Sequence, residues 1–108
     1  MRLVGMAILA LIKADGVSKE IYEQLRKEVN WEGNPPPGGM FHVAGTENNG
    51  MRVVDIWSSE QDFHNFVNSR LKPALQKRNA PVPDAEIIQI HNINVFPGLE
   101  KYRVAQTH

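Results

Sequence analysis

The sequence predicts an α+β domain whose elements follow the order β-α-β-β-α-β. Three observations carry this prediction: a continuously apolar run near the start, two segments with apolar residues at helical spacing, and an Asn-Gly pair between two β-rich runs. The chain has 108 residues, enough for one hydrophobic core. We therefore expect a single domain over residues 1–96, followed by a C-terminal tail over residues 97–108.

The composition excludes several classes of protein. Twelve basic residues balance twelve acidic ones and no basic stripe is present, which argues against nucleic-acid binding. The chain is 42% hydrophobic and 22% charged, as globular proteins usually are, so no membrane partner is expected. Absence of cysteine excludes disulfides, thiolate nucleophiles and cysteine-based metal sites. A reducing, cytoplasmic location fits this composition.

The run "MRLVGMAILALIK" (residues 1–13) is expected to form the first strand. A basic residue followed by apolar residues resembles the core of a signal peptide, but no small-x-small cleavage site follows and Lys13 and Asp15 come at once. The run is also too short to cross a bilayer. A helix is then expected from Lys19 to Val29 with Ser18 as N-cap, ending before the irregular loop "NWEGNPPPGG" (residues 30–39).

The stretch "FHVAGTENNGMRVVDIW" (residues 41–57) predicts a β-hairpin with Asn49-Gly50 as a type I′ turn. This turn pairs Ala44 with Asp55 and His42 with Trp57. Alternation then divides the side chains between two faces. One face holds Phe41, Val43, Gly45, Val54 and Ile56, and the other holds His42, Ala44, Thr46, Val53, Asp55 and Trp57.

A second helix is expected to begin at Ser59, with a capping interaction toward Asp62. Its apolar stripe contains Pro73, which should kink the helix near Ser69 or Arg70. A last long strand is expected over residues 86–96. The resulting plan is ferredoxin-like: a four-stranded antiparallel sheet with two helices on one face. The open face, expected to carry Val53, Trp57 and isoleucines, is too apolar for water, so we expect a homodimer to cover it.

Five short motifs resemble those of small bacterial proteins in the dimeric α/β-barrel superfamily, which includes antibiotic-biosynthesis-monooxygenase-like proteins. The motifs are Pro36 to Gly39, His42, Asp55 with Trp57, Arg70 to Ala74, and His91-Asn92. The resemblance implies a dimeric barrel that binds a small molecule. Members of this superfamily act as cofactor-free oxygenases, haem-degrading enzymes, isomerases, dehalogenases or plain ligand binders, so the fold does not choose the activity.

His42, Asp55 and His91 are the candidate catalytic residues. His42 is predicted to point away from the helices, where it acts as a general base; the alternative is a buried imidazole that holds the hairpin together. Asp55 would orient His42 or His91, or else pair with Arg70 or a backbone amide. His91 is expected to face the same cavity, with Ile88 facing the helices. A two-histidine, one-carboxylate iron site is the less favoured alternative, and no metal or other cofactor is expected.

Four further residues are predicted to bind a ligand: Trp57, Gln89, Val53 and Ala44. Trp57 would be a stacking wall, although an indole on a sheet face is often plain core or dimer interface. Tyr22, Trp31 and Tyr102 give no constellation, and Arg70 is expected to be structural. The sequence thus predicts a dimer that binds a small aromatic or polyketide-like molecule, either as a cofactor-free monooxygenase or isomerase or as a non-catalytic ligand-binding or regulatory protein.

Overall fold

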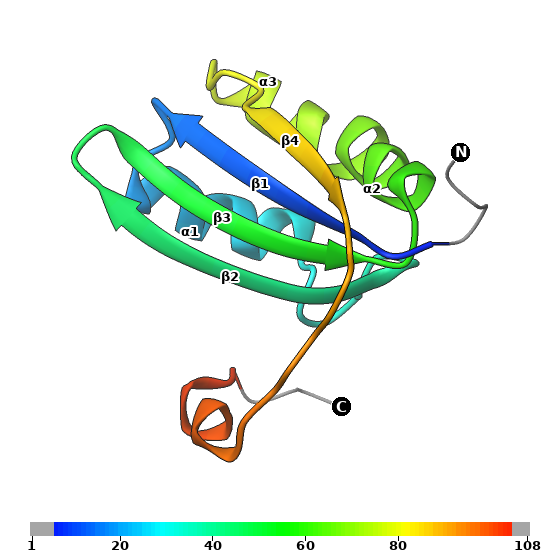
Figure 1. Cartoon of the computed structure of the whole chain (residues 1–108). Coiled ribbons are helices and arrows are strands. Elements are labelled where there is room, and N and C mark those ends of the chain that lie inside the picture. Colours follow the sequence, from blue (N-terminus) through cyan, green and yellow to red (C-terminus); the bar gives the residue numbers. More distant parts are fainter. Residues whose placement is uncertain (1–5, 105–108) are drawn as a thin grey trace.

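The structure, a computed structural model, describes residues 6–104 and contains one four-stranded antiparallel sheet with helices on one face (Figure 1). The strands lie in the order β2-β3-β1-β4, so the ferredoxin-like fold is confirmed. Part of the predicted first strand falls on residues 1–5, outside the described residues. The elements in chain order are β1 Ile8–Asp15, α1 Lys19–Val29, β2 Gly39–Glu47, β3 Gly50–Trp57, α2 Glu60–Phe66, η1 Val67–Leu71, α3 Lys72–Lys77, β4 Asp84–Gln89 and η2 Pro97–Tyr102.

Helix α1 has the bounds that its capping residues predict. The Ser18 hydroxyl accepts a hydrogen bond from the Ile21 amide at 3.1 Å, and Asn30 ends the helix in the left-handed conformation with φ 56°. Leu25 and Val29 are buried toward the sheet. Because both ends depend on local chemistry, the bounds of α1 are set independently of more distant contacts.

The second helical segment bends at a π-helix, η1, directly before Pro73. Pro73 has no amide hydrogen for the Ser69 carbonyl, and its ring crowds that carbonyl, so the regular hydrogen-bond ladder cannot continue. Arg70 in η1 donates to the carbonyl oxygens of Val29 at 2.7 Å and Asn34 at 2.8 Å. The π-helix thus covers Ser69 and Arg70, where the kink was predicted, and Arg70 has the expected structural role, with carbonyls as its partners.

The predicted hairpin register is wrong by two residues. His42 lies opposite Asp55 and Ala44 opposite Val53, and Glu47–Gly50 closes the hairpin. The loop residues are therefore Asn48-Asn49, neither of which has the positive φ of a type I′ turn. Gly50 is required for another reason: it has φ 150°, and a Cβ there would lie 2.2 Å from the Ala14 carbonyl oxygen of β1. Because the shift is even, the side chains that were predicted to share a face still share one.

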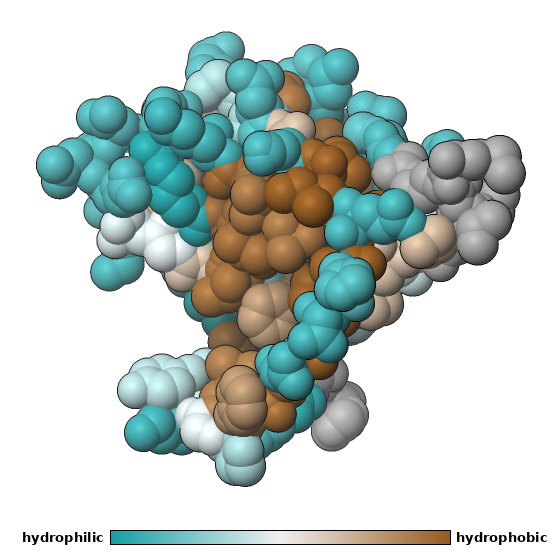
Figure 2. Space-filling model, in the orientation of Figure 1, coloured by the Kyte–Doolittle hydropathy of each residue, from teal (hydrophilic) through white to brown (hydrophobic). Residues whose placement is uncertain are grey.

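The assignment of the two faces is also wrong. The set with His42, Val53, Asp55 and Trp57 lies under the helices, where Trp57 packs with Ile8 and Phe63. Alternation separates two sets of side chains but does not tell which set the helices cover. The polar residues His42 and Asp55 made their set look like the one away from the helices, which is wrong. The open face instead exposes Leu11, Val43 and Ile88 at 38%, 48% and 44%. Figure 2 shows this face as a broad apolar surface over the sheet.

The last strand is shorter than predicted. β4 ends at Gln89, opposite Ile8, and the Ile90 amide then donates to the Ala7 carbonyl. Ile88 lies on the open face, not toward the helices as predicted.

Among the described residues, none of the helices has the length and apolar content needed to span a bilayer.

Candidate functional site

His42 lies in the middle of the edge strand β2, with its side chain on the helix-covered face. Its Nδ1 lies 2.7 Å from Oδ1 of Asp55, which is directly opposite on β3. The His42 side chain is 33% exposed, whereas that of Asp55 is only 8% exposed. The imidazole therefore links a buried carboxylate to the solvent-accessible edge of the sheet.

Both oxygens of the Asp55 carboxylate have partners. Oδ2 accepts a hydrogen bond from Trp57 Nε1 at 3.2 Å, while Oδ1 faces His42. Arg70, the alternative partner considered from the sequence, donates to backbone carbonyls instead. Burying a carboxylate is costly unless it is hydrogen-bonded, and these two donors supply that compensation.

Tyr22 of α1 completes a chain of three side chains. Its hydroxyl lies 2.6 Å from His42 Nε2. Because a carboxylate only accepts, Nδ1 of His42 donates to Asp55, and in the neutral ring Nε2 accepts the Tyr22 hydroxyl hydrogen. Burial raises the pKa of Tyr22 to about 12, against the opposing influence of Arg26. Tyr22 is therefore a protonated hydrogen-bond donor at neutral pH, and we name Asp55, His42 and Tyr22 the relay.

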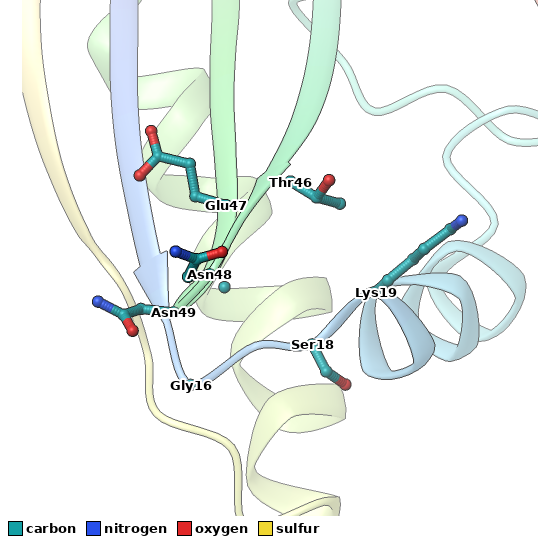
Figure 3. A pocket seen from close by; sticks show the side chains of 8 residues that line it. Gly16, Ser18, Lys19, Thr46, Glu47, Asn48 and Asn49 are labelled. Carbon is teal, nitrogen blue, oxygen red and sulfur yellow. The ribbon is translucent and has the colours of Figure 1, made fainter.

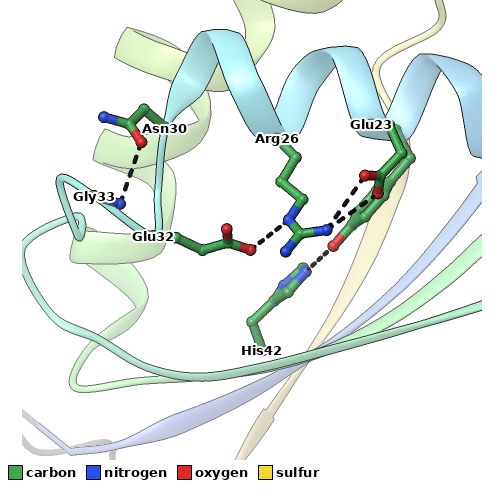
Figure 4. A network of polar contacts seen from close by, with 7 residues as sticks. Glu23, Arg26, Asn30, Glu32, Gly33 and His42 are labelled. Atoms are coloured by element: carbon green, nitrogen blue, oxygen red, sulfur yellow. Dashed lines mark hydrogen bonds and ion pairs between the residues drawn. The ribbon is translucent and has the colours of Figure 1, made fainter. Parts of the chain in front are cut away.

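Aromatic and charged side chains surround the exposed end of the relay. The Trp31 ring centroid lies 5.4 Å from that of His42 and 5.6 Å from that of Tyr22. Arg26, one turn after Tyr22, is held between Glu23 and Glu32 above the His42 ring (Figure 4). Its hydrogen bond to Glu32 raises the pKa of the guanidinium. The partly exposed His42 ring is thus flanked by two aromatic side chains, with a fixed cation nearby.

Tyr22 and Trp31 are the site residues that sequence analysis missed. Sequence analysis places Tyr22 in the helix expected over Lys19–Val29 and Trp31 in the irregular loop of residues 30–39, with no site role for either. One signal was available for Tyr22, because a tyrosine on a core-facing stripe needs a partner for its hydroxyl. Trp31 gave no such signal, since only the folded path of the loop brings it to His42.

The other predicted site residues do not gather around His42. Val53 and Trp57 are buried in the core, and Ala44 packs against it. Gln89 is exposed on β4 and bonds to Met6. His91 lies beyond the end of β4, at the sheet edge opposite β2, and is exposed, so the structure does not bring it together with His42. Within residues 6–104, no three potential metal ligands gather.

A separate open hollow of about 320 Å³ lies at the turn end of the hairpin (Figure 3). Residues at and beside the β1–α1 and β2–β3 connections line it, including Gly16, Lys19 and Glu47. Thr46 at its edge is four residues along β2 from His42, roughly 13 Å in an extended strand. None of the predicted site residues or relay residues borders this hollow, so it is not the site that the relay defines.

The ferredoxin-like fold of this chain is similar to that of several solved structures. A protein of unknown function, NE2512 from Nitrosomonas europaea, matches with a TM-score of 0.56 at 15% identity over 86% of this chain and 95% of its own. The cofactor-independent oxygenase SnoaB from Streptomyces nogalater matches with a TM-score of 0.53 at 12% identity, covering 87% of this chain and 99% of its own.

A third similar structure is a monooxygenase from the gene ActVA-Orf6 of Streptomyces coelicolor in complex with nanaomycin D. It matches with a TM-score of 0.52 at 20% identity, covering 85% of this chain and 92% of its own. No protein-family profile matches the chain. No curated protein matches it either. At these identities the similarity establishes the fold alone. The side chains of the relay are the basis for any statement about the chemistry of this protein.

Proposed function

We propose that the protein binds a small aromatic or polyketide-like molecule beside the partly exposed His42 ring and acts on it by proton transfer. The observation that carries this proposal is the relay: a buried carboxylate fixes one nitrogen of an imidazole that is a third exposed, and a tyrosine hydroxyl lies at the other nitrogen. A base oriented by a carboxylate is the usual arrangement for removing a proton from a bound ligand. Trp31 and Tyr22 supply aromatic surface for a planar ligand.

In this proposal His42 Nε2 accepts a proton from an acidic C–H or O–H group of the ligand. Tyr22 occupies Nε2 in the unliganded protein. Its hydroxyl must therefore turn from Nε2 to an oxygen of the ligand, which frees the base and stabilises the developing anion. Asp55 stabilises the imidazolium that forms. The raised pKa of Tyr22 suits this role, because the hydroxyl stays protonated and donates.

The reaction class that we propose is a cofactor-independent oxygenation, with isomerisation as the related outcome. In the first case the carbanion adds dioxygen, the resulting peroxide takes the proton from the His42 imidazolium, and the hydroperoxide loses water to leave a carbonyl. In the second case the imidazolium returns the proton to the substrate at another position. Two of the structural neighbours are a cofactor-independent oxygenase and a monooxygenase, and for this reason we place oxygenation before isomerisation. We also propose that the chain works as a cytoplasmic homodimer paired through its open sheet face.

One observation favours a second candidate function. Within the described residues, every buried side-chain nitrogen and oxygen atom has a hydrogen-bond partner, so the relay is satisfied without a ligand. A relay of this kind could serve recognition alone, in a non-catalytic ligand-binding or regulatory dimer with His42 and Asp55 as recognition groups. The two functions differ in whether His42→Gln, which keeps polar atoms at the site, removes turnover alone or affinity as well, whereas His42→Ala removes the contacts of the whole side chain and weakens binding in both.

A thermal-shift screen tests the binding site. Wild type, His42→Ala and the control His64→Ala are compared against hydroxyaromatics, quinones, fatty acids, haem and divalent metals. At a hundredfold excess over its Kd, a ligand adds about 2.7 kcal/mol to the free energy of unfolding. We expect a hydroxyaromatic or quinone to stabilise wild type and His64→Ala but not His42→Ala. No shift with any compound, together with a less stable His42→Ala, would assign His42 a structural role only.

A further inference from the structure

The loop between α1 and β2 brings two side chains to the relay. Trp31 packs on the rings of His42 and Tyr22, with centroid distances of 5.4 and 5.6 Å. Glu32 accepts a hydrogen bond from Arg26 beside these rings. Trp31 and Glu32 are each only partly buried, so burial alone does not hold them in place. Their positions therefore depend on how firmly the backbone of the loop is fixed.

The first part of this loop is a closed turn over residues 30–34. The Asn34 amide donates to the Asn30 carbonyl at 2.9 Å. The Gly33 amide donates to Oδ1 of Asn30 at 3.2 Å (Figure 4). These bonds keep the shape of the turn, because each of them joins two residues of the turn itself. A further contact is needed to hold the turn as a unit beside the relay.

Arg70 supplies that contact from the second helical segment. Its Nη2 donates to the carbonyl oxygens of Val29, at 2.7 Å, and of Asn34, at 2.8 Å. This nitrogen carries two hydrogens, so each carbonyl receives one, and hydrogen bonds from a charged donor are the stronger kind. The two carbonyls lie on either side of Trp31 and Glu32 in the chain. Arg70 therefore holds the turn at both of its ends.

The bend in the second helical segment fixes Arg70 itself. In η1 the Lys72 amide donates to the Val67 carbonyl, five residues back, and single π turns of this kind are frequent at functional sites. The guanidinium also lies over the Phe66 ring, 5.5 Å from its centroid. Arg70 is thus a half-buried support held on its own helix, and not a mobile surface side chain.

We propose that Arg70 is a positioning residue of the site, because it holds the turn of residues 30–34 so that Trp31 stays against His42 and Tyr22. The role goes beyond packing, since the two carbonyls that Arg70 binds flank the tryptophan on which a planar ligand stacks. Arg70 acts through the loop backbone and makes no contact of its own with the ligand. This inference rests on the proposed function for the ligand, whereas the position of Trp31 is a property of the protein alone.

The first test needs no ligand. Full-length protein labelled with 5-fluorotryptophan gives one fluorine resonance for each of its two tryptophans, Trp31 and Trp57, assigned with Trp31→Phe. In Arg70→Met we expect the Trp31 resonance to move toward that of a solvent-exposed tryptophan. The Trp57 resonance should stay, because that ring is buried in the core. Arg70→Lys, which keeps a cationic donor, should move the Trp31 resonance less.

Arg78→Met is the matched control for this test. Arg78, at the end of α3, also bonds to α1, through Glu28 at 2.8 Å, and its partners in the described part of the chain lie outside the loop. The control should leave both tryptophan resonances in place. An unmoved Trp31 resonance in Arg70→Met would refute the proposal. So would equal movement of both tryptophan resonances, which would mean general loosening of the fold.

A double-mutant cycle tests whether Arg70 acts through Trp31. The probe is 1-naphthol, a hydroxyaromatic, and calorimetry measures its dissociation constant. Trp31→Ala and Arg70→Met should each raise this constant about 2- to 12-fold, the value of one aromatic contact, and the double variant should raise it no further. Losses that multiply in the double variant would refute the proposal. Failure of wild type to bind 1-naphthol would count against the proposed function, while the tryptophan resonances still decide the role of Arg70.

Discussion

Replacing Asp55 with alanine is expected to lower the free energy of unfolding by about 3 kcal/mol. The carboxylate is 6% exposed and accepts from both Trp57 and His42. Its removal leaves the buried Trp57 N–H without an acceptor, which costs about 1–3 kcal/mol, and opens a small cavity under α1. The His42 N–H also loses its acceptor, but this lowers the free energy of unfolding less, because the His42 ring is partly exposed to solvent. Chemical denaturation of wild type and variant measures the difference.

Asp84→Ala is the matched control, because Asp84 is an exposed carboxylate on β4. Its effect should stay within about 0.5 kcal/mol. Asp55→Asn should fall between the two, since an amide has one oxygen for two donors. An Asp55→Ala variant as stable as Asp84→Ala would mean that solvent reaches Asp55 and that the relay has no buried anchor.

His42→Gln is expected to reduce turnover about 10²- to 10⁴-fold, the usual contribution of a general base, while ligand affinity changes little. Glutamine keeps polar atoms near Asp55 and Tyr22 but cannot take up a proton. The assay is dioxygen consumption or product formation with a compound that the thermal-shift screen identifies, and the dissociation constant is measured by calorimetry on the same sample.

His64→Gln serves as the control for the His42 experiment, because His64 is an exposed histidine of α2 that pairs with Glu60. It should leave both turnover and affinity unchanged. Equal losses of turnover and affinity in His42→Gln would favour the recognition function over the base. Full turnover in His42→Gln would remove His42 from the chemistry altogether.

The parts of the fold that sequence analysis predicted correctly are those fixed by local chemistry. Ser18 and Ser59 mark the starts of α1 and α2 because their hydroxyls cap amides three residues ahead. The hairpin register failed because Gly50 is selected by the nearby Ala14 carbonyl of β1, a contact from another strand. The end of β4 failed for a similar reason, since it depends on where the pairing with β1 stops.

The candidate site was predictable only in part. Alternation along the hairpin places His42 and Asp55 on one face, and this relation survives the two-residue error in register. The face itself could not be assigned, because both sets of side chains are apolar enough to be buried. Tyr22 comes from α1 and Trp31 from the following loop, so their approach to His42 is a property of the tertiary fold.

The measurement that tests the relay most directly is the proton–nitrogen correlation spectrum of the His42 imidazole at neutral pH. The signals are assigned by comparison with His42→Gln. We expect the neutral ring to carry its proton on Nδ1, facing Asp55, and the Nε2 resonance to move both in Tyr22→Phe and on adding a ligand from the screen. A ring protonated on Nε2, with a resonance that neither change affects, would contradict the account.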